Sequence, residues 1–159
     1  MSEELAVLIT TFPAYEGLPL PRYMSAQAAG MDVYAAVAAE VVIPPGAWCV
    51  IPTGIAIALP AGYEAQVRPR SGLAVRYGVT IANTPGTIDA DYRGEIGIIL
   101  INHGERNFVV RRGDRIAQLV VQSVCRVSWA RCRQLPATGR GEGGFGHTER
   151  EPYEEVQDQ

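Results

Sequence analysis

Short turns of proline and glycine punctuate the chain, and no other feature constrains its fold as strongly. P-P-G at 44–46, P-T-G at 52–54 and P-A-G at 60–62 each separate two short apolar runs. Proline presets φ for the first turn position and glycine accepts φ above zero at the next, so extended chain ends at these points. Short runs repeated about every eight to twelve residues predict an all-β protein.

The expected strands are short and together cover most of the chain. They lie at residues 5–10, 31–36, 40–43, 47–51, 54–59, 63–67, 95–101, 108–110 and 115–124. A β-sandwich or jelly roll fits such a series best. One short helix is expected at 72–77, with Ser71 as its N-cap and Gly78 as the C′ residue that ends it.

Length and composition indicate one domain. With 159 residues, of which 47% are hydrophobic, the chain can build one core but not two comfortable ones. We expect the domain to span residues 1–136 and residues 137–159 to form a flexible arm. The net charge of −3, without a long basic run, argues against a nucleic-acid polymer as a partner.

The cysteines and the first residues predict a cytoplasmic protein. The three cysteines, which include no C-x-x-C pair, fit neither a disulfide framework nor a zinc site. Glu3 and Glu4 precede a short apolar run at 5–9, a pattern that supports neither a signal peptide nor a membrane span. The compartment is therefore expected to be reducing.

Residues 83–95 read N-T-P-G-T-I-D-A-D-Y-R-G-E and predict a tight hairpin that reverses at Pro85 and Gly86. In extended chain three apolar side chains of this region would share one face, namely Ile88, Tyr92 and Ile96. The charged side chains would crowd onto the other side, namely Asp89, Asp91, Arg93 and Glu95. A purely structural hairpin needs less charge than this.

This hairpin carries the groups needed to bind the polar edge of a flat ring. Backbone N–H and C=O groups at its open end can pair with such an edge, and Asn83 adds an amide with a donor and an acceptor. Tyr92 can form the pocket floor, which leaves Asp89 within a few residues of the ligand. A solvated turn with a surface tyrosine is the competing interpretation, and it explains single residues better than the whole stretch.

Polar side chains in three other places need an explanation. The expected helix start follows Arg68 and Arg70, and its free N–H groups would favour an anion, although an ordinary capped surface helix fits equally well. Asp32 interrupts an apolar strand, so its carboxylate either pairs with an arginine or helps to hold a hydrated cation. Gln118 interrupts a later strand, where most glutamines face solvent.

The last part of the chain is rich in glycine and has no periodicity that would support a helix or strand. Residues 140–146 lack the G-K-[S/T] ending of a nucleotide-binding P-loop. A flexible arm is expected instead, whose backbone N–H groups can wrap polyphosphate while Arg140 pairs with a terminal phosphate and Phe145 covers a planar base. No role is assigned to the acidic residues 149–159.

Five stretches of the chain, in this order, resemble the signature motifs of the trimeric dUTP pyrophosphatases (dUTPases) of the bacterial type. They are A-G-M-D-V-Y-A at 29–35, R-P-R-S-G-L-A at 68–74, the stretch 83–95, G-D-R-I-A-Q at 113–118 and R-G-E-G-G-F-G-H-T at 140–148. His147 stands where many members have serine, but bacterial-type members also carry histidine there.

The resemblance implies a β jelly roll that hydrolyses dUTP to dUMP and pyrophosphate with Mg²⁺ bridging the triphosphate. This reaction limits uracil in DNA and supplies dUMP for thymidylate synthesis. The resemblance also implies a homotrimer with shared active sites, in which the arm of one subunit closes over the site of another. No membrane partner is expected.

The resemblance further assigns roles to individual residues. Asp89 is the base that deprotonates the attacking water, and Asp32 lies near the metal-bound water, with no protein side chain bound directly to the metal. Tyr92 leaves no room for a ribose 2′-hydroxyl. The substrate-binding residues are Arg70, Ser71, Gly72, Asn83, Gly86, Thr87, Ile88, Asp89, Tyr92, Gly97, Gln118, Arg140, Phe145 and Gly146.

Two alternatives stay open at this point. An enzyme related to dCTP deaminase would share the fold and also bind a pyrimidine deoxynucleotide, but the D-Y-R-G-E stretch and the complete glycine-rich arm favour the pyrophosphatase. A non-catalytic nucleotide-sensing protein of the same fold would be expected to lack Asp89 or the arm, and this chain has both.

Overall fold

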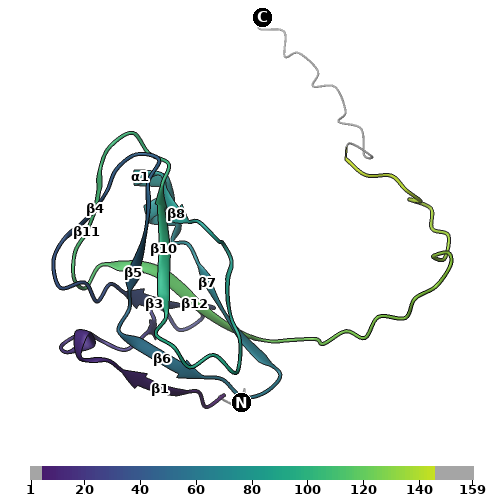
Figure 1. Cartoon of the computed structure of the whole chain (residues 1–159), viewed down its shortest axis with the longest axis horizontal. Coiled ribbons are helices and arrows are strands. Elements are labelled where there is room, and N and C mark those ends of the chain that lie inside the picture. Colours follow the sequence, from purple (N-terminus) through teal and green to yellow (C-terminus); the bar gives the residue numbers. More distant parts are fainter. Residues whose placement is uncertain (1–4, 146–159) are drawn as a thin grey trace, which may run out of the picture. The chain divides into compact units, whose positions relative to one another are not determined.

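Strands dominate the computed structural model, which describes residues 5–145 (Figure 1). The first half contains β1 (Leu8–Thr11), a 3-10 turn (Pro13–Tyr15), β2 (Arg22–Tyr23), β3 (Met31–Tyr34), β4 (Val41–Ile43), β5 (Trp48–Pro52), β6 (Ile55–Ala58) and β7 (Tyr63–Arg68). The single described α-helix, α1 (Ser71–Tyr77), is followed by β8 (Val79–Ile81), β9 (Gly86–Ile88), β10 (Gly97–Asn102), β11 (Phe108–Val110) and β12 (Arg115–Ser123).

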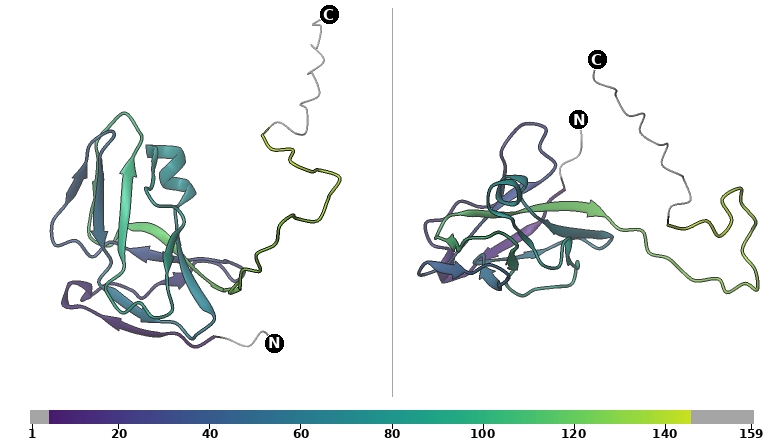
Figure 2. Two further views of the ribbon diagram at one scale, coloured as in Figure 1. Left: turned by 45° about the vertical axis from the view of Figure 1, so that its right-hand side comes forward. Right: turned by 90° about the horizontal axis from the view of Figure 1, so that it is seen from above.

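The strands form four sheets, all with antiparallel pairing. The largest has the order β2-β3-β12-β7-β9, and a second has the order β5-β10-β8. Two smaller pairs, β1-β6 and β11-β4, complete the fold. Figure 2 shows these sheets as layers around a common interior, which is the arrangement of a β-sandwich. The prediction of an all-β jelly roll with one short helix is confirmed.

Alternating side chains of the two larger sheets meet in the core. In β10 the residues Ile98 and Leu100 are buried while Gly97 is exposed, as expected for a strand with one face inward. Across from them lie buried residues of β3, β7 and β12, among them Val33, Val67, Ala117 and Leu119. The apolar runs between the proline-glycine turns therefore supply the core.

Each predicted strand is present, with ends shifted by a few residues. Strands β2, β8 and β9 were not predicted, because they have only two or three residues each and lack a visible alternation. Gly78 ends α1 with φ of 68°, as expected for a C′ glycine. The N-cap prediction is wrong: Arg70 holds that position in extended conformation, without a side-chain cap, and Ser71 is the first helical residue.

The stretch 83–95 does not form the predicted hairpin. β8 pairs with β10 and β9 pairs with β7, so the chain around the cis peptide Thr84–Pro85 passes from one sheet to another. Gly86 has no positive φ, contrary to the prediction for this turn. After β9 the chain leaves the extended conformation, so Ile88 and Ile96 are buried while Tyr92 is exposed.

The structure divides into two units, residues 1–125 and 126–159. All described helices and strands belong to the first unit. In the described part of the second, up to Phe145, hydrogen-bonded turns occur in place of regular elements: the N–H of Gly141 donates to the carbonyl of Thr138, and Arg140 Nε donates to the carbonyl of Gly143. The expected boundary between residues 136 and 137 remains a prediction.

Within residues 5–145, no helix has both the length and the apolar character needed to cross a membrane.

Candidate functional site

A cavity of about 200 Å³ opens beside the stretch that the sequence singled out. We call it the 83–97 cavity. Seven residues of the predicted site line it, namely Asn83, Gly86, Thr87, Ile88, Asp89, Tyr92 and Gly97. Its remaining wall comes from Val67, Ile81, Glu95, Ile96 and Ile99. Two acids, one amide and one phenol therefore line this cavity together with five aliphatic side chains.

Two strands bring the cavity wall close together at Gly86. A Cβ on Gly86 would lie 3.2 Å from Asn83 Nδ2 and 3.4 Å from Val67 Cβ. Glycine at this position therefore lets the Asn83 amide lie across the start of β9. The sequence predicted the right residue for the wrong reason, since close approach and not backbone conformation is what glycine provides here.

The loop after β9 is braced by its own side chains. The N–H of Tyr92 donates to the carbonyl of Asp89 at 3.1 Å. Arg93 Nη1 donates to the carbonyls of Ala90 and Tyr92 at 2.7 and 2.8 Å, and the Tyr92 hydroxyl donates to the carbonyl of Glu95 at 2.9 Å. Asp89, which is exposed at the end of β9, thus starts a short loop with several internal bonds.

A second group of predicted residues surrounds the buried carboxylate of Asp32. Arg115 Nη1 lies 3.0 Å and Arg70 Nη2 lies 3.4 Å from Asp32 Oδ2, and Gln118 Nε2 donates to Asp32 Oδ1 at 3.2 Å. The Asp32 side chain is only 2% exposed. We call these four residues the Asp32 cluster. Two guanidinium groups around one carboxylate leave an excess positive charge, which suits an anion.

A β-bulge creates this cluster. Gln118 lies opposite Asp32 in the pairing of β12 with β3, whereas the register shifts between Arg115 and Ala117. Residues three apart on a regular strand point to opposite faces, but the extra residue at the bulge brings Arg115 and Gln118 to the same carboxylate. Pairing with arginine, one of the two alternatives for Asp32, is therefore present.

The turn before β12 holds this end of the sheet in place. Asp114 Oδ2 accepts the backbone N–H of Arg111 at 2.8 Å, and the carbonyl of Asp114 accepts the N–H of Ala35 at 2.8 Å. Gly113 has φ of 83°, a left-handed conformation that glycine adopts without the steric strain of a side chain. This turn joins β12 to the end of β3, where the Asp32 cluster lies.

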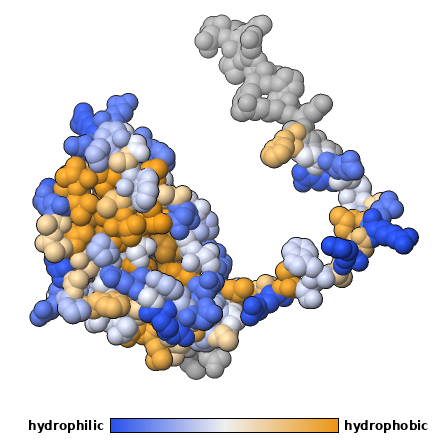
Figure 3. Space-filling view, viewed as in Figure 1, coloured by the Kyte–Doolittle hydropathy of each residue, from blue (hydrophilic) through white to orange (hydrophobic). Residues whose placement is uncertain are grey.

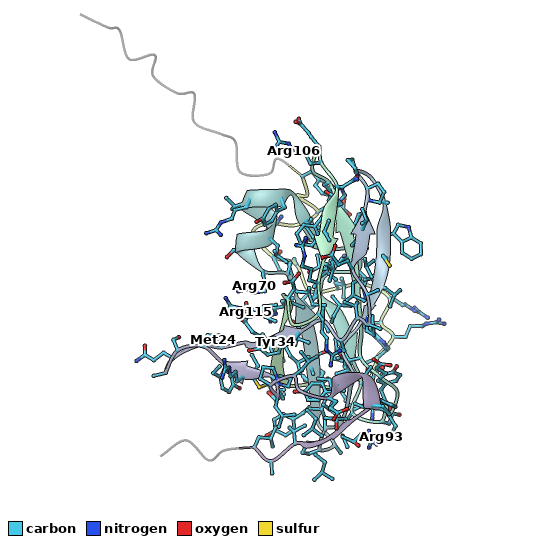
Figure 4. The ribbon with its side chains drawn as sticks, turned by 90° about the vertical axis from the view of Figure 1, so that its left-hand side faces the viewer. Met24, Tyr34, Arg70, Arg93, Arg106 and Arg115 are labelled. Atoms are coloured by element: carbon cyan, nitrogen blue, oxygen red, sulfur yellow. The ribbon has the colours of Figure 1, made fainter. Side chains whose placement is uncertain are left out.

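A larger hollow of about 680 Å³ opens beside the Asp32 cluster. Its charged lining consists of Arg70, Arg76, Arg111, Asp114 and Arg115, and Gly72 of α1 also faces it. None of its lining residues is shared with the 83–97 cavity. Figure 4 shows Arg70 and Arg115 side by side, with Arg93 of the other group far from them.

The structure therefore brings the predicted residues together in two groups and leaves a few apart. Ser71 lies exposed at the start of α1. Arg140 and Phe145 belong to the second unit, and their relation to either group stays a prediction. Gly146 and His147 lie outside the described residues.

Three residues that matter for the geometry were not predicted from the sequence. Arg115 was hidden by the bulge, because strand alternation places it away from Gln118. Glu95 was assigned to a charged outer side but turns inward, where its Oε1 accepts the N–H of Gly54 at 2.8 Å. Arg93 was counted as surface charge, although its guanidinium closes the loop. The dense charge of 83–95 was the available signal for the last two.

The fold and the two hollows define an all-β jelly-roll protein with a small cavity beside an exposed acid and a separate cluster of basic groups. Comparison with known proteins identifies the family to which this chain belongs. The dUTPase family model matches residues 16–149. The chain belongs to the dUTPase family.

Similar proteins include two relatives named deoxyuridine 5'-triphosphate nucleotidohydrolase. The protein from Maricaulis maris is 60% identical over 144 residues, which cover 89% of this chain and 95% of the relative. The protein from Syntrophotalea carbinolica is 64% identical over 129 residues, which cover 81% and 88%. A solved dUTPase from phage phi11 of S. aureus, described with a structural Mg(II) ion, has the same fold, with 23% identity, a TM-score of 0.73 and coverage of 83% and 99%.

Proposed function

We propose that this protein hydrolyses dUTP to dUMP and pyrophosphate. The observation that carries the proposal is the 83–97 cavity, in which a small space lined in part by aliphatic side chains meets the amide of Asn83, the ring of Tyr92 and the carboxylate of Asp89. At about 200 Å³ it is smaller than the 300–1,000 Å³ that is typical of pockets for larger ligands, as a site for a base and its sugar should be. The named activity of the two relatives supports the same reaction.

In this proposal the base is selected by hydrogen bonds and the sugar by shape. The Asn83 amide and backbone groups at Gly86, Thr87 and Ile88 bind the edge that distinguishes uracil from cytosine, and a base with the wrong edge leaves them unpaired. Tyr92 lies under the deoxyribose and excludes a 2′-hydroxyl. Gly97 lies in the cavity wall, and its lack of a side chain allows close packing against β5, because a Cβ there would lie 2.9 Å from Val50 Cγ1.

The triphosphate binds to the Asp32 cluster and the start of α1. Arg70, Ser71, Gly72 and Gln118 hold the phosphate groups, and Arg115 belongs with them because its guanidinium shares the Asp32 carboxylate. Gly72 has open space where a Cβ would be, so a phosphate can approach its backbone. The fixed positive groups stabilise the charge of the reacting phosphate.

The donor set fits a magnesium ion held mainly by the substrate. Between residues 5 and 145, no three His, Cys, Asp or Glu side chains gather where they could bind a metal ion. Both oxygens of Asp32 are already engaged by arginine and glutamine, so Asp32 would act on a metal-bound water. Mg²⁺ would neutralise charge on the phosphate oxygens. The structural Mg(II) ion described for the phage phi11 enzyme supports a role for this ion.

Asp89 is the catalytic base of the proposed reaction. Its carboxylate accepts a proton from water, whose oxygen forms a bond to the α-phosphorus while the bond from that phosphorus to the bridging oxygen breaks. Pyrophosphate leaves with the bridging oxygen and dUMP remains. Asp89 lies exposed at the rim of the cavity, as a group that must reach a water beside the substrate should.

A homotrimer with shared sites explains why the predicted residues lie in two separate groups. A substrate must touch both, and a neighbouring subunit can bring its Asp32 cluster to the cavity of the first. The outer face of β5 and β10 offers a surface for this, because Trp48 and Val50 are 64% and 53% exposed. Ile99 faces outward beside Val50 and also lines the cavity. Figure 3 shows apolar side chains gathered on this side of the molecule.

The arm completes the site in the same proposal. Arg140 pairs with the terminal phosphate, while Phe145 and Gly146 cover the base. We place the reaction in the cytoplasm, where the three free cysteines Cys49, Cys125 and Cys132 would stay reduced.

Release of pyrophosphate from dUTP, dCTP, UTP and dTTP tests the proposal. Fast release from dUTP alone, with dUMP as the other product, is the expected result. Deamination of dCTP would point to the alternative enzyme, and binding without turnover would point to a sensor.

A further inference from the structure

Glu95 joins two segments of the chain that meet beside the 83–97 cavity. Its side-chain Oε1 accepts the backbone N–H of Gly54 at 2.8 Å, and its backbone carbonyl accepts the hydroxyl of Tyr92 at 2.9 Å. The side chain is half-buried and lines the cavity. One residue thus connects the turn at 52–55 to the tyrosine that faces the ligand space.

The turn at 52–55 is a firm anchor. The buried hydroxyl of Thr53 donates to the carbonyl of Ile96 at 2.6 Å, and the N–H of Ile96 donates to the carbonyl of Ile55 at 2.9 Å. Gly54 has φ of 69°, and a Cβ there would lie 2.9 Å from Tyr15 Cβ. Its backbone position is therefore fixed by packing as well as by conformation.

Tyr92 needs such an anchor because the residue is 46% exposed. The ring packs over Gly94, where a Cβ would lie 2.6 Å from Tyr92 Cζ. An exposed side chain with few neighbours keeps several rotamers, so one hydrogen bond can decide where it lies. The bond from the Tyr92 hydroxyl to the Glu95 carbonyl has this role.

We propose that Glu95 is a positioning residue for sugar selection. Its carboxylate ties the loop to Gly54, this fixes the Glu95 carbonyl, and the carbonyl holds the Tyr92 ring as the wall that excludes a 2′-hydroxyl. The inference rests on the proposed hydrolysis of dUTP, and it assigns to Glu95 a hydrogen bond and not a charge at the reacting phosphate. A wall of a specific site must be supported from behind to keep its shape.

Two substitutions of Glu95 and one control test this role. Glu95→Ala removes the acceptor, so the ratio of kcat/KM for dUTP to that for UTP should fall about tenfold. Glu95→Gln keeps an acceptor for Gly54 and should stay within about twofold of the wild-type ratio. Asp91→Ala is the control, because Asp91 is an exposed acid of the same loop with no side-chain bond to a described residue, and it should also keep the ratio.

Two outcomes of this series overturn the inference. One is a Glu95→Ala protein with the wild-type ratio. The other is a Glu95→Gln protein as impaired as Glu95→Ala, which would make the charge the important property. If UTP turnover is too slow to follow, its inhibition constant against dUTP replaces kcat/KM in the ratio.

A double-mutant cycle separates positioning from general stability. Tyr92→Phe keeps the ring and removes its bond to the Glu95 carbonyl, so it should lower the ratio by itself. In that background Glu95→Ala should lower the ratio by less than about a further twofold, because both changes break the same connection. Additive effects would show that Glu95 acts by another route.

Gly94→Ala should also displace the Tyr92 ring, and it leaves Glu95 unchanged. It replaces Glu95→Ala as the test if the Glu95→Ala protein does not fold. Its methyl group must displace the Tyr92 ring, so the ratio should fall while the link from Glu95 to Gly54 stays intact. An unchanged ratio in a folded Gly94→Ala protein contradicts the inference. A wild-type protein without activity on dUTP would instead refute the proposed function, so the two failures are distinguishable.

Discussion

The guanidinium of Arg115 lies 3.0 Å from the carboxylate of Asp32. The Asp32 side chain is only 2% exposed, so the acidic partner of this ion pair is almost completely buried. Removing one partner of a buried pair leaves the other charge without compensation. Because the arginines left behind, Arg115 and Arg70, are 42% and 24% exposed and water can solvate them, Asp32→Ala should lower the free energy of unfolding by about 1–3 kcal/mol. Chemical unfolding at a fixed protein concentration measures this change.

Glu40→Ala provides the matched control. Glu40 pairs with Arg111 at 2.6 Å, but both side chains are more than half exposed. Such a surface pair contributes about 0–1 kcal/mol. If Asp32→Ala and Glu40→Ala lose the same free energy of unfolding, the buried Asp32 cluster does not stabilise the fold more than a surface ion pair does.

The bulge in β12 explains why this pair could not be foreseen. Asp32 stood out in the sequence as an acid among apolar residues, and its two possible partners were stated. Its actual partner depends on a register shift between Arg115 and Ala117, and alternation in the sequence does not reveal such a shift.

The same contrast applies to the 83–97 cavity. Seven of its lining residues were predicted, because charge, tyrosine and asparagine crowd into one stretch. Its architecture was not, since β8 and β9 each pair with a different distant strand and the turn between them looks like a hairpin turn. The turns, most strands and the Gly78 helix end follow from local conformational rules, whereas pairing partners and the inward turn of Glu95 depend on long-range contacts.

Tyr92→Ala should weaken discrimination between dUTP and UTP. In the proposed mode of binding the ring is the wall next to the sugar, so its loss should raise kcat/KM for UTP relative to that for dUTP. Steady-state kinetics on both nucleotides measure the change. An unaltered ratio would mean that the 2′ position is recognised elsewhere.

Tyr15→Phe should reduce the loss of stability in alkali. Burial, with a further contribution from the nearby Tyr34, raises the pKa of Tyr15. Ionisation of Tyr15 therefore leaves the stability of the folded protein unchanged below about pH 10 and lowers it as the pH rises further. The Tyr15 hydroxyl is buried and has no hydrogen-bond partner among the described residues, so its removal should also be neutral or stabilising by about 1 kcal/mol at pH 7.

Unfolding of Tyr15→Phe from pH 7 to 11 checks this, with Tyr23→Phe as a control at an exposed tyrosine. The wild type and the control should lose stability more steeply than Tyr15→Phe above about pH 10. Parallel curves for all three proteins would refute the assignment.

Mixed trimers test whether the arm serves a neighbouring subunit. A chain truncated after Thr138 should form a folded trimer with very low activity, and so should a full-length Asp89→Asn chain. Co-folding the two should restore activity, because about a quarter of sites in random equal mixtures combine an intact Asp89 with an intact arm from another chain. If mixed trimers form and remain inactive, each arm serves its own subunit.

The most direct test of the proposed function is the turnover of Asp89→Asn on dUTP. Asparagine keeps the size of the side chain but cannot accept the proton from water, so kcat should fall by about 10² to 10⁴ while the dissociation constant for dUTP stays within a few-fold of wild type. Pyrophosphate release gives kcat, and equilibrium binding to the slow variant gives the dissociation constant. Near-normal turnover in the folded variant would contradict the role of Asp89, and with it the assignment of the 83–97 cavity as the reaction site.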